Sequence, residues 1–83
     1  METINILEKY IVDEIAVDFG IKSLEPDKDL LSSGIIDSMA VMKLVMFLEE
    51  TFGLEVNDQD IVPENFQDLN SLVEYVEQKK QPK

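Results

Sequence analysis

The chain has 83 residues, 45% of them apolar and 30% charged, and a net charge of −11. That length suits one domain with a small core, and the charge makes nucleic acids and anionic membrane surfaces poor partners. Cysteine and histidine are absent, which excludes disulfides and zinc sites built from these residues. Met1–Lys9 lacks a basic segment and no apolar run reaches membrane-spanning length, so we expect a cytoplasmic protein without a membrane partner.

Apolar residues recur every three or four positions near the start of the chain, at Ile4, Leu7, Ile11 and Ile15. This spacing predicts an amphipathic helix over about residues 3–18, with Gly20 as its C-terminal stop. Residues 21–37 then form an irregular connection that is longer than most loops. Its apolar side chains predict that it is pinned to the helices: Leu24, Leu30, Leu31, Ile35 and Ile36.

The second predicted helix covers residues 39–52, which contain neither proline nor glycine. Ser38 stands at its N-terminus and Asp37 suits the N-cap. The unpaired backbone N–H groups and the helix dipole favour an anionic group there, such as a phosphate ester on Ser38. No histidine exists to activate this serine, and the nearby Lys28 and Lys43 belong to no catalytic pattern. We therefore expect that the chain is not an enzyme and that another protein modifies Ser38.

This helix has two apolar faces. The residues expected in the core are Val41, Leu44, Val45, Leu48 and Phe52. A second stripe contains Met39, Met42 and Met46 beside Lys43. A helix that is apolar nearly all round can be buried on several sides, whereas methionine also suits exposed surfaces that adapt to several partners. We favour an exposed docking face.

An acidic link over residues 55–60 precedes Pro63-Glu64-Asn65-Phe66. Proline suits the first position of a helix, so a short helical turn is expected there. Asp58, Asp60 and Glu64 lack the spacing of a calcium-binding loop and are interpreted as solvated carboxylates.

The last helix is expected from about residue 68 or 70 to residue 78, with Leu69, Leu72, Val73 and Val76 apolar. Ser71 and Glu74 form either a capping box or an ordinary pair one turn apart. Residues 79–83 are expected to be a flexible basic tail. Together the elements predict one all-α domain over residues 1–83. It is an antiparallel four-helix bundle of three long helices and one short helix, with a long loop between the first two helices.

The whole chain also carries an ordered series of motifs: Gly34-Ile35-Ile36-Asp37-Ser38-Met39, then Leu44, Glu49-Glu50, Phe52-Gly53 and Pro63-Glu64-Asn65-Phe66. This series resembles the acyl and peptidyl carrier protein family. The resemblance implies that a phosphopantetheinyl transferase, using coenzyme A and Mg²⁺, attaches 4′-phosphopantetheine to Ser38, and that Asp37 belongs to the surface the transferase recognises. The arm would hold acyl or aminoacyl groups as thioesters. Four residues would then contact partner enzymes: Met39, Met42, Lys43 and Met46.

Some positions distinguish branches of the family. Ala40 and Lys43 stand where carriers of bacterial fatty acid synthesis usually have acidic residues, and Phe47 stands where alanine is common. The double isoleucine before Asp37 looks more like aminoacyl, peptidyl and D-alanyl carriers. We therefore expect a discrete, monomeric carrier of a specialised pathway, which an acyl or aminoacyl ligase loads and which delivers its cargo to downstream transferases. A carrier of fatty acid or polyketide synthesis is the alternative within the family, and a non-carrier acidic helical adaptor is the alternative outside it.

Overall fold

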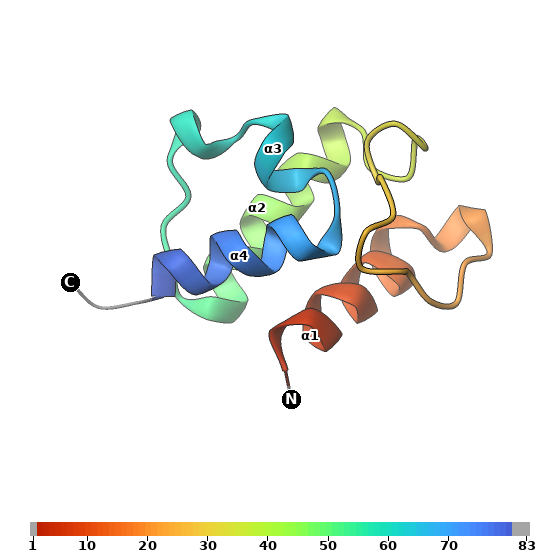
Figure 1. Ribbon diagram of the computed structural model, residues 1–83, viewed down its shortest axis with the longest axis horizontal. Coiled ribbons are helices and arrows are strands. Elements are labelled where there is room, and N and C mark those ends of the chain that lie inside the picture. Colours follow the sequence, from red (N-terminus) through yellow and green to blue (C-terminus); the bar gives the residue numbers. More distant parts are fainter. Residues whose placement is uncertain (1, 81–83) are drawn as a thin grey trace.

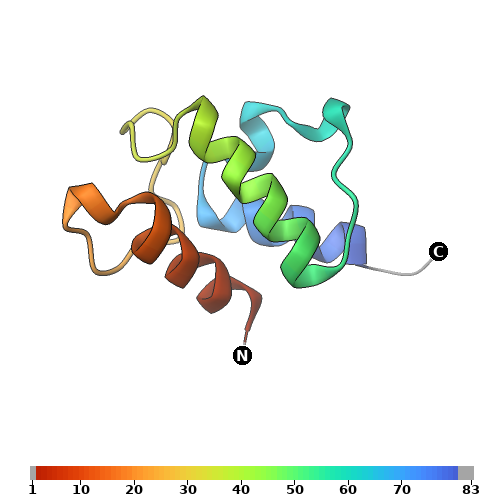
Figure 2. The same cartoon turned by 180° about the vertical axis from the view of Figure 1, so that it is seen from behind.

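The computed structural model describes residues 2–80. Its α-helices are α1 (Thr3–Tyr10), α2 (Ser38–Phe52), α3 (Pro63–Phe66) and α4 (Leu69–Lys80), and residues 2–80 contain no strand. α1 runs antiparallel to both α2 and α4, which run in the same direction (Figures 1 and 2). α4 packs against each of the other three helices. The predicted all-α bundle with a long first connection is confirmed, and the structure adds the parallel course of α2 and α4.

The core is formed by apolar side chains alone, since no polar or charged side chain is buried among the described residues. The largest fully buried side chains come from every helix and from the first connection: Leu7, Ile11, Leu30, Ile36, Leu44, Leu48, Phe66, Leu69, Leu72 and Val76. A contiguous core of this kind supplies most of the favourable free energy of folding.

The first helical segment departs from the prediction of one regular helix over residues 3–18. After α1 the chain forms a π-helical turn over Ile11–Ile15, in which the Ala16 N–H donates to the Ile11 carbonyl at 2.7 Å, and then a 3₁₀ turn over Val17–Phe19. The wider turn inserts one residue into the helical period. For this reason Ala16 is fully buried while Ile15 is only half-buried. The predicted stop is confirmed, because Gly20 ends the segment at a left-handed φ of 66°.

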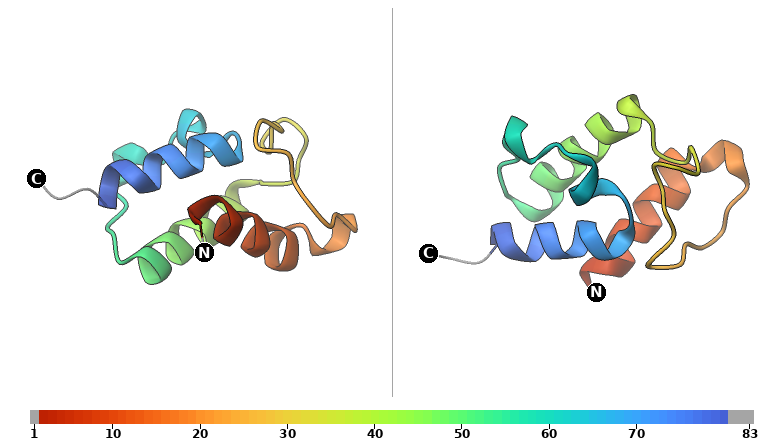
Figure 3. Two further views of the ribbon diagram at one scale, coloured as in Figure 1. Left: turned by 60° about the horizontal axis from the view of Figure 1, so that its bottom comes forward. Right: turned by 45° about the horizontal axis from the view of Figure 1, so that its top comes forward.

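The connection over residues 21–37 is pinned to the bundle, as predicted. Four of its five expected apolar anchors are buried, and Leu31 is half-buried. Backbone hydrogen bonds add to this packing: the Leu30 N–H donates to the Gln67 carbonyl at 2.7 Å, and the Asn70 N–H donates to the Pro26 carbonyl at 3.1 Å. The connection therefore lies against the α3–α4 junction (Figure 3).

The C-terminal elements refine the prediction. Asp68, rather than Ser71, caps α4, because its carboxylate accepts from the Ser71 N–H at 2.8 Å. Of the two alternatives for Ser71 and Glu74, the capping box is wrong, because Ser71 lies within the first turn. α4 also continues to Lys80, so the first two residues of the expected tail are helical, and residues 81–83 lie outside the described part. Within that part, no helix combines the length and the apolar character needed to cross a membrane.

The acidic link is tied to α4 through one carboxylate. The Tyr75 hydroxyl donates to Asp60 Oδ2 at 2.8 Å, and Lys79 Nζ lies 3.6 Å from the same oxygen. The Asp60 carbonyl also accepts from the Asn65 side chain at 2.7 Å. Burial, together with the hydrogen bond to Asp60, raises the pKa of the Tyr75 hydroxyl well above its usual value. These contacts fix the link where it enters α3, and they show that Asp60 is engaged within the protein rather than simply solvated.

Candidate functional site

The N-terminus of α2 presents a serine beside a capped helix end. Asp37 is in an extended conformation and its carboxylate accepts from the Ala40 N–H at 2.9 Å, which is N-cap geometry. Ser38 is exposed. Within residues 2–80 the N–H groups of Ser38 and Met39 make no hydrogen bond. An anion attached to Ser38 would therefore meet free donors and the positive end of the helix dipole.

This serine has no activating base in the described part of the chain, because no carboxylate or amine is hydrogen-bonded to its hydroxyl. One oxygen of the Asp37 carboxylate caps the helix by accepting from the Ala40 N–H. A serine hydroxyl without an adjacent base is a weak nucleophile. The site can receive a group from another catalyst, and it lacks the parts needed to perform chemistry alone.

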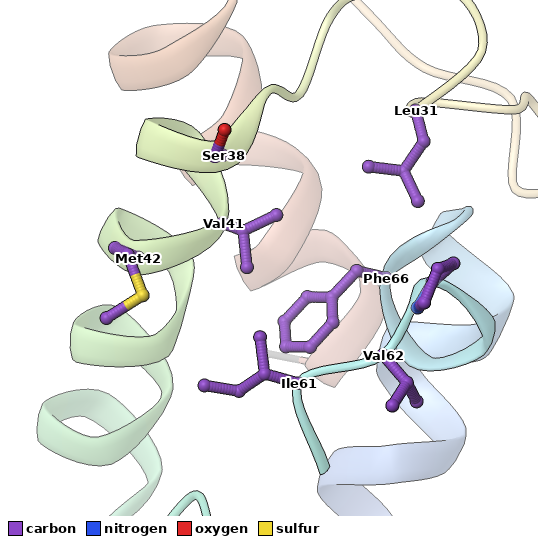
Figure 4. A pocket seen from close by; sticks show the side chains of 8 residues that line it. Leu31, Ser38, Val41, Met42, Ile61, Val62 and Phe66 are labelled. Atoms are coloured by element: carbon purple, nitrogen blue, oxygen red, sulfur yellow. The ribbon is translucent and has the colours of Figure 1, made fainter. Parts of the chain in front are cut away.

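An apolar hollow of about 340 Å³ opens beside Ser38, between α2 and the segment that leads into α3. Figure 4 shows Phe66 and Ile61 facing Val41 across it, with Ser38 at one end and its hydroxyl turned away from the Phe66 ring. Its remaining lining residues are Leu31, Met42, Val62 and Pro63. This hollow was not predicted from the sequence, although the apolar pair Ile61-Val62 directly before Pro63 is a signal that could have indicated it.

The methionine stripe of α2 is exposed, as predicted. Met39, Met42 and Met46 are 74%, 52% and 58% exposed, and Lys43 between them is also exposed. The structure therefore brings the four predicted docking residues to one face of the helix that begins at Ser38. Their role in docking stays a prediction.

The three positions that distinguish family branches have different environments. Ala40 is buried at 7% exposure, whereas Lys43 is exposed. Phe47 is half-buried, and its ring stacks on the Tyr10 ring of α1 with centroids 3.9 Å apart and planes at 15°. The bulky residue at position 47 therefore joins α1 to α2, because aromatic pairs in this arrangement attract each other beyond their burial.

Comparison with known proteins identifies the family. Residues 9–76 match the family described as phosphopantetheine attachment site. The chain belongs to this family. It is similar to an acyl carrier protein of Solidesulfovibrio magneticus, with 30% identity over 89% of this chain and 90% of the relative. An acyl carrier protein of Helicobacter hepaticus is 29% identical, over 96% of this chain and all of the relative.

A D-alanyl carrier protein of Lactobacillus delbrueckii subsp. bulgaricus is 35% identical, over 84% of this chain and 89% of the relative. The protein is thus a phosphopantetheine carrier and not an enzyme, which confirms both expectations. The alternative of a non-carrier adaptor is wrong. The cofactor of this carrier protein is 4′-phosphopantetheine. As a carrier protein, the chain is modified by a phosphopantetheinyl transferase and interacts with partner enzymes.

The start of α2 fits this cofactor. The exposed hydroxyl of Ser38 can form a phosphodiester, and the free N–H groups of the first helical turn can bind the phosphate oxygens. When bound, the group supplies the thiol that a chain without cysteine lacks.

Proposed function

We propose that Ser38 is the residue that carries 4′-phosphopantetheine. The observation that supports this most directly is the exposed Ser38 hydroxyl at the N-terminus of α2, next to free backbone donors and the Asp37 cap. Other serines are present in the described residues, at positions 23, 32, 33 and 71. None of them stands at the start of a long helix with a capping aspartate directly before it.

The attachment chemistry follows from these groups. Ser38 Oγ attacks the phosphorus of coenzyme A that bears the pantetheine moiety, and an Oγ–P bond forms. The P–O bond within the pyrophosphate breaks, and adenosine 3′,5′-bisphosphate leaves. The serine proton passes to a base of the transferase, since the carrier has none beside Ser38. Mg²⁺ on the transferase would neutralise charge on the leaving phosphate, and Asp37 would contribute to the surface that the transferase recognises.

Intact-mass analysis tests this assignment. The protein is incubated with coenzyme A, Mg²⁺ and a phosphopantetheinyl transferase of broad carrier specificity. We expect a gain of one phosphopantetheine in the wild type and none in Ser38→Ala, while circular dichroism shows the same helical content in both. Ser33→Ala, a serine in the neighbouring loop, is the matched control and should be modified like the wild type. Modification of Ser38→Ala would contradict the assignment.

We propose further that the exposed face of α2 docks the partner enzymes. Met39, Met42 and Met46 offer adaptable apolar contacts that begin at the modified residue. The net charge of −11 favours partners with basic docking patches. A tethered cargo then meets each active site at a high effective concentration. In this function the protein acts as a monomer in the cytoplasm, where coenzyme A is available.

For the cargo, we propose an amino acid or a specialised acid, loaded as a thioester by an adenylating ligase. Support comes from Ala40, Lys43 and Phe47, and from the similarity to a protein named D-alanyl carrier protein. Ala40 is largely buried, and Lys43 gives the docking face a positive charge. Both positions therefore differ from the acidic surface expected of a fatty acid synthesis carrier.

A carrier of fatty acid or polyketide synthesis is the second candidate. The apolar hollow of about 340 Å³ beside Ser38 favours it, because such a hollow suits an aliphatic chain. Parallel assays distinguish the two functions: ligase-dependent loading with a panel of amino acids, and malonyl transfer followed by chain elongation. We expect ligase-dependent loading to be the more efficient. Efficient malonylation and elongation would select the second candidate.

A further inference from the structure

Two strongly exposed apolar side chains lie outside the methionine face. Val17 and Phe19 are 63% and 52% exposed, and both belong to the 3₁₀ turn that follows the π-helical turn. Ala16, directly before them, is fully buried. This anchor and the left-handed Gly20 fix the turn on both sides, so Phe19 is held at the surface of an ordered segment. The aromatic ring on this turn is therefore accessible to a partner.

Phe19 shares a hollow with the start of α2. This second hollow, of about 260 Å³, is lined by Phe19 from the turn and by Met39 from α2, with Ile35 and Ala40 adding apolar surface. Asp37 also lines it, whereas Ser38 lines the first hollow, between α2 and α3. The two residues that flank Ser38 in the chain therefore open onto the Phe19 side. Together Phe19 and Met39 form an apolar rim beside the modified serine.

We propose that this Phe19 hollow is a docking site for the phosphopantetheinyl transferase. The inference rests on the proposed modification of Ser38. The transferase must bring its reacting atoms to about 3–3.5 Å from Ser38 Oγ, so its surface has to cover the residues next to this atom. Enzymes that act on the cargo reach the thiol at the far end of the arm. They can dock without covering the Phe19 turn.

The charges around the hollow indicate what the transferase presents there. Asp18 and Asp37 contribute carboxylates to its lining, and Lys43 contributes one ammonium group. The apolar part of the lining, mainly Phe19 and Met39, can contact an aliphatic or aromatic side chain. The excess of negative charge attracts a basic residue next to it. The complementary element is therefore an apolar side chain with a neighbouring lysine or arginine. Phe19 is the expected anchor, because aromatic residues at the centre of a contact contribute a large share of binding energy.

Steady-state kinetics of the same transferase, with coenzyme A and Mg²⁺, tests the inference. Phe19→Ala should lower kcat/KM at least about fivefold through a higher KM for the carrier, while kcat stays within twofold of the wild type. The reason is that the lost contact stabilises the bound ground state and the transition state equally. Phe19→Met keeps an apolar side chain and should retain most of the wild-type kcat/KM. Phe52→Ala is the control for lost aromatic packing away from the site, since the half-buried Phe52 ends α2, about 20 Å from Ser38 at 1.5 Å per residue. It should leave kcat/KM unchanged.

Each outcome has a distinct meaning. Unchanged kinetics in Phe19→Ala, with normal modification of the wild type at Ser38, would overturn the docking site and leave the proposed function intact. An equal loss in Phe52→Ala would also overturn it, because the effect would then follow general destabilisation. Failure of the wild type to be modified at Ser38 would instead reject the proposed function itself.

Discussion

The two faces of α2 differ sharply although they share one backbone. Leu44 and Leu48 are 0% exposed and pack in the core, whereas Met42 and Met46, on the opposite face, are 52% and 58% exposed. All four are large apolar residues, so composition alone does not separate them. The stability of this carrier and its proposed contacts with enzymes therefore depend on different sides of the same helix. Substitutions can therefore change one property and leave the other.

The largest expected effect falls on the buried face. Leu44→Ala and Leu48→Ala each remove buried methyl and methylene groups and leave a cavity, which costs about 2–5 kcal/mol. A domain of this size has only about 4–12 kcal/mol of stability in total. Urea unfolding followed by circular dichroism should show a much lower midpoint for both variants. A loss of less than about 1 kcal/mol in the free energy of unfolding would mean that this face of α2 does not pack in the core.

Loss of the Tyr75–Asp60 hydrogen bond should have the next largest effect. Tyr75→Phe keeps the ring but removes the donor to a charged acceptor, which costs about 1–2 kcal/mol. The change loosens the segment that leads into α3 and leaves the methionine face untouched. Chemical denaturation at pH 7 measures the loss of stability in Tyr75→Phe. If transfer by partner enzymes fell while stability did not change, the link would belong to the contact surface.

The raised pKa of the Tyr75 hydroxyl predicts that the free energy of unfolding depends on pH. In the unfolded chain Tyr75 loses its proton near pH 10, whereas in the folded protein burial and Asp60 raise its pKa. The unfolded state therefore binds fewer protons above pH 10, and the free energy of unfolding falls there by up to about 1.4 kcal/mol per pH unit. Below pH 10 this contribution is fully present. Comparison of the wild type with Tyr75→Phe between pH 8 and 11 should show a shallower decline in the variant.

Substitution of Asp37, the N-cap of α2, should have a moderate effect on stability. Asp37→Ala removes the helix cap and costs about 0.5–2 kcal/mol, while Asp37→Asn keeps a capping oxygen and should stay within a few tenths of the wild type. If the carboxylate is also recognised by the transferase, Asp37→Asn slows phosphopantetheinylation without lowering the melting temperature. Equal modification rates for wild type and Asp37→Asn would limit this residue to its capping role.

The smallest effect on stability is expected on the exposed face. Met42→Glu and Met46→Glu should change the free energy of unfolding by no more than about 0.5 kcal/mol, as is usual for surface positions. They should nevertheless slow transfer to or from partner enzymes, because the new charge must lose water at the contact. Lys43→Glu tests the same face by charge and should mainly change the association rate and its salt dependence.

Thermal melts paired with loading rates decide between the two faces. Unfolding of Met42→Glu to the extent seen for Leu44→Ala would show that the methionines are core and that the docking assignment is wrong. Loading rates that match the wild type in all three variants would place the enzyme contacts elsewhere.

Periodicity predicted the helices well where the backbone stays regular. The core positions Leu44 and Leu48 follow from spacing alone, and Asp37 and Pro63 have strong local preferences for the helix starts that they occupy. The π-helical turn after α1 was not predicted, because it interrupts the regular period that the apolar spacing indicates. A periodic pattern assumes a constant 3.6 residues per turn.

Two of the features not predicted from the sequence are products of tertiary packing. The hollow beside Ser38 requires α3 to lie across from Val41, and the Phe19 hollow requires the turn after α1 to approach Met39. No local signal gives such distances between residues far apart in the chain. The cap at Asp68 shows a different limit, because Ser71 fits the same capping preference and only the observed hydrogen bond decides between them.

The exposed methionine face also has a consequence for chemical ageing of the protein. Oxidation converts a thioether into a polar sulfoxide, and reagents such as hydrogen peroxide reach exposed sulfur atoms first. Among residues 2–80, methionine occurs only at positions 39, 42 and 46, and all three are exposed. Mild oxidation would therefore spare the hydrophobic interior and alter the surface that begins at Ser38. Such a protein would keep its melting temperature while its enzyme contacts weaken, and methionine sulfoxide reductases would restore them.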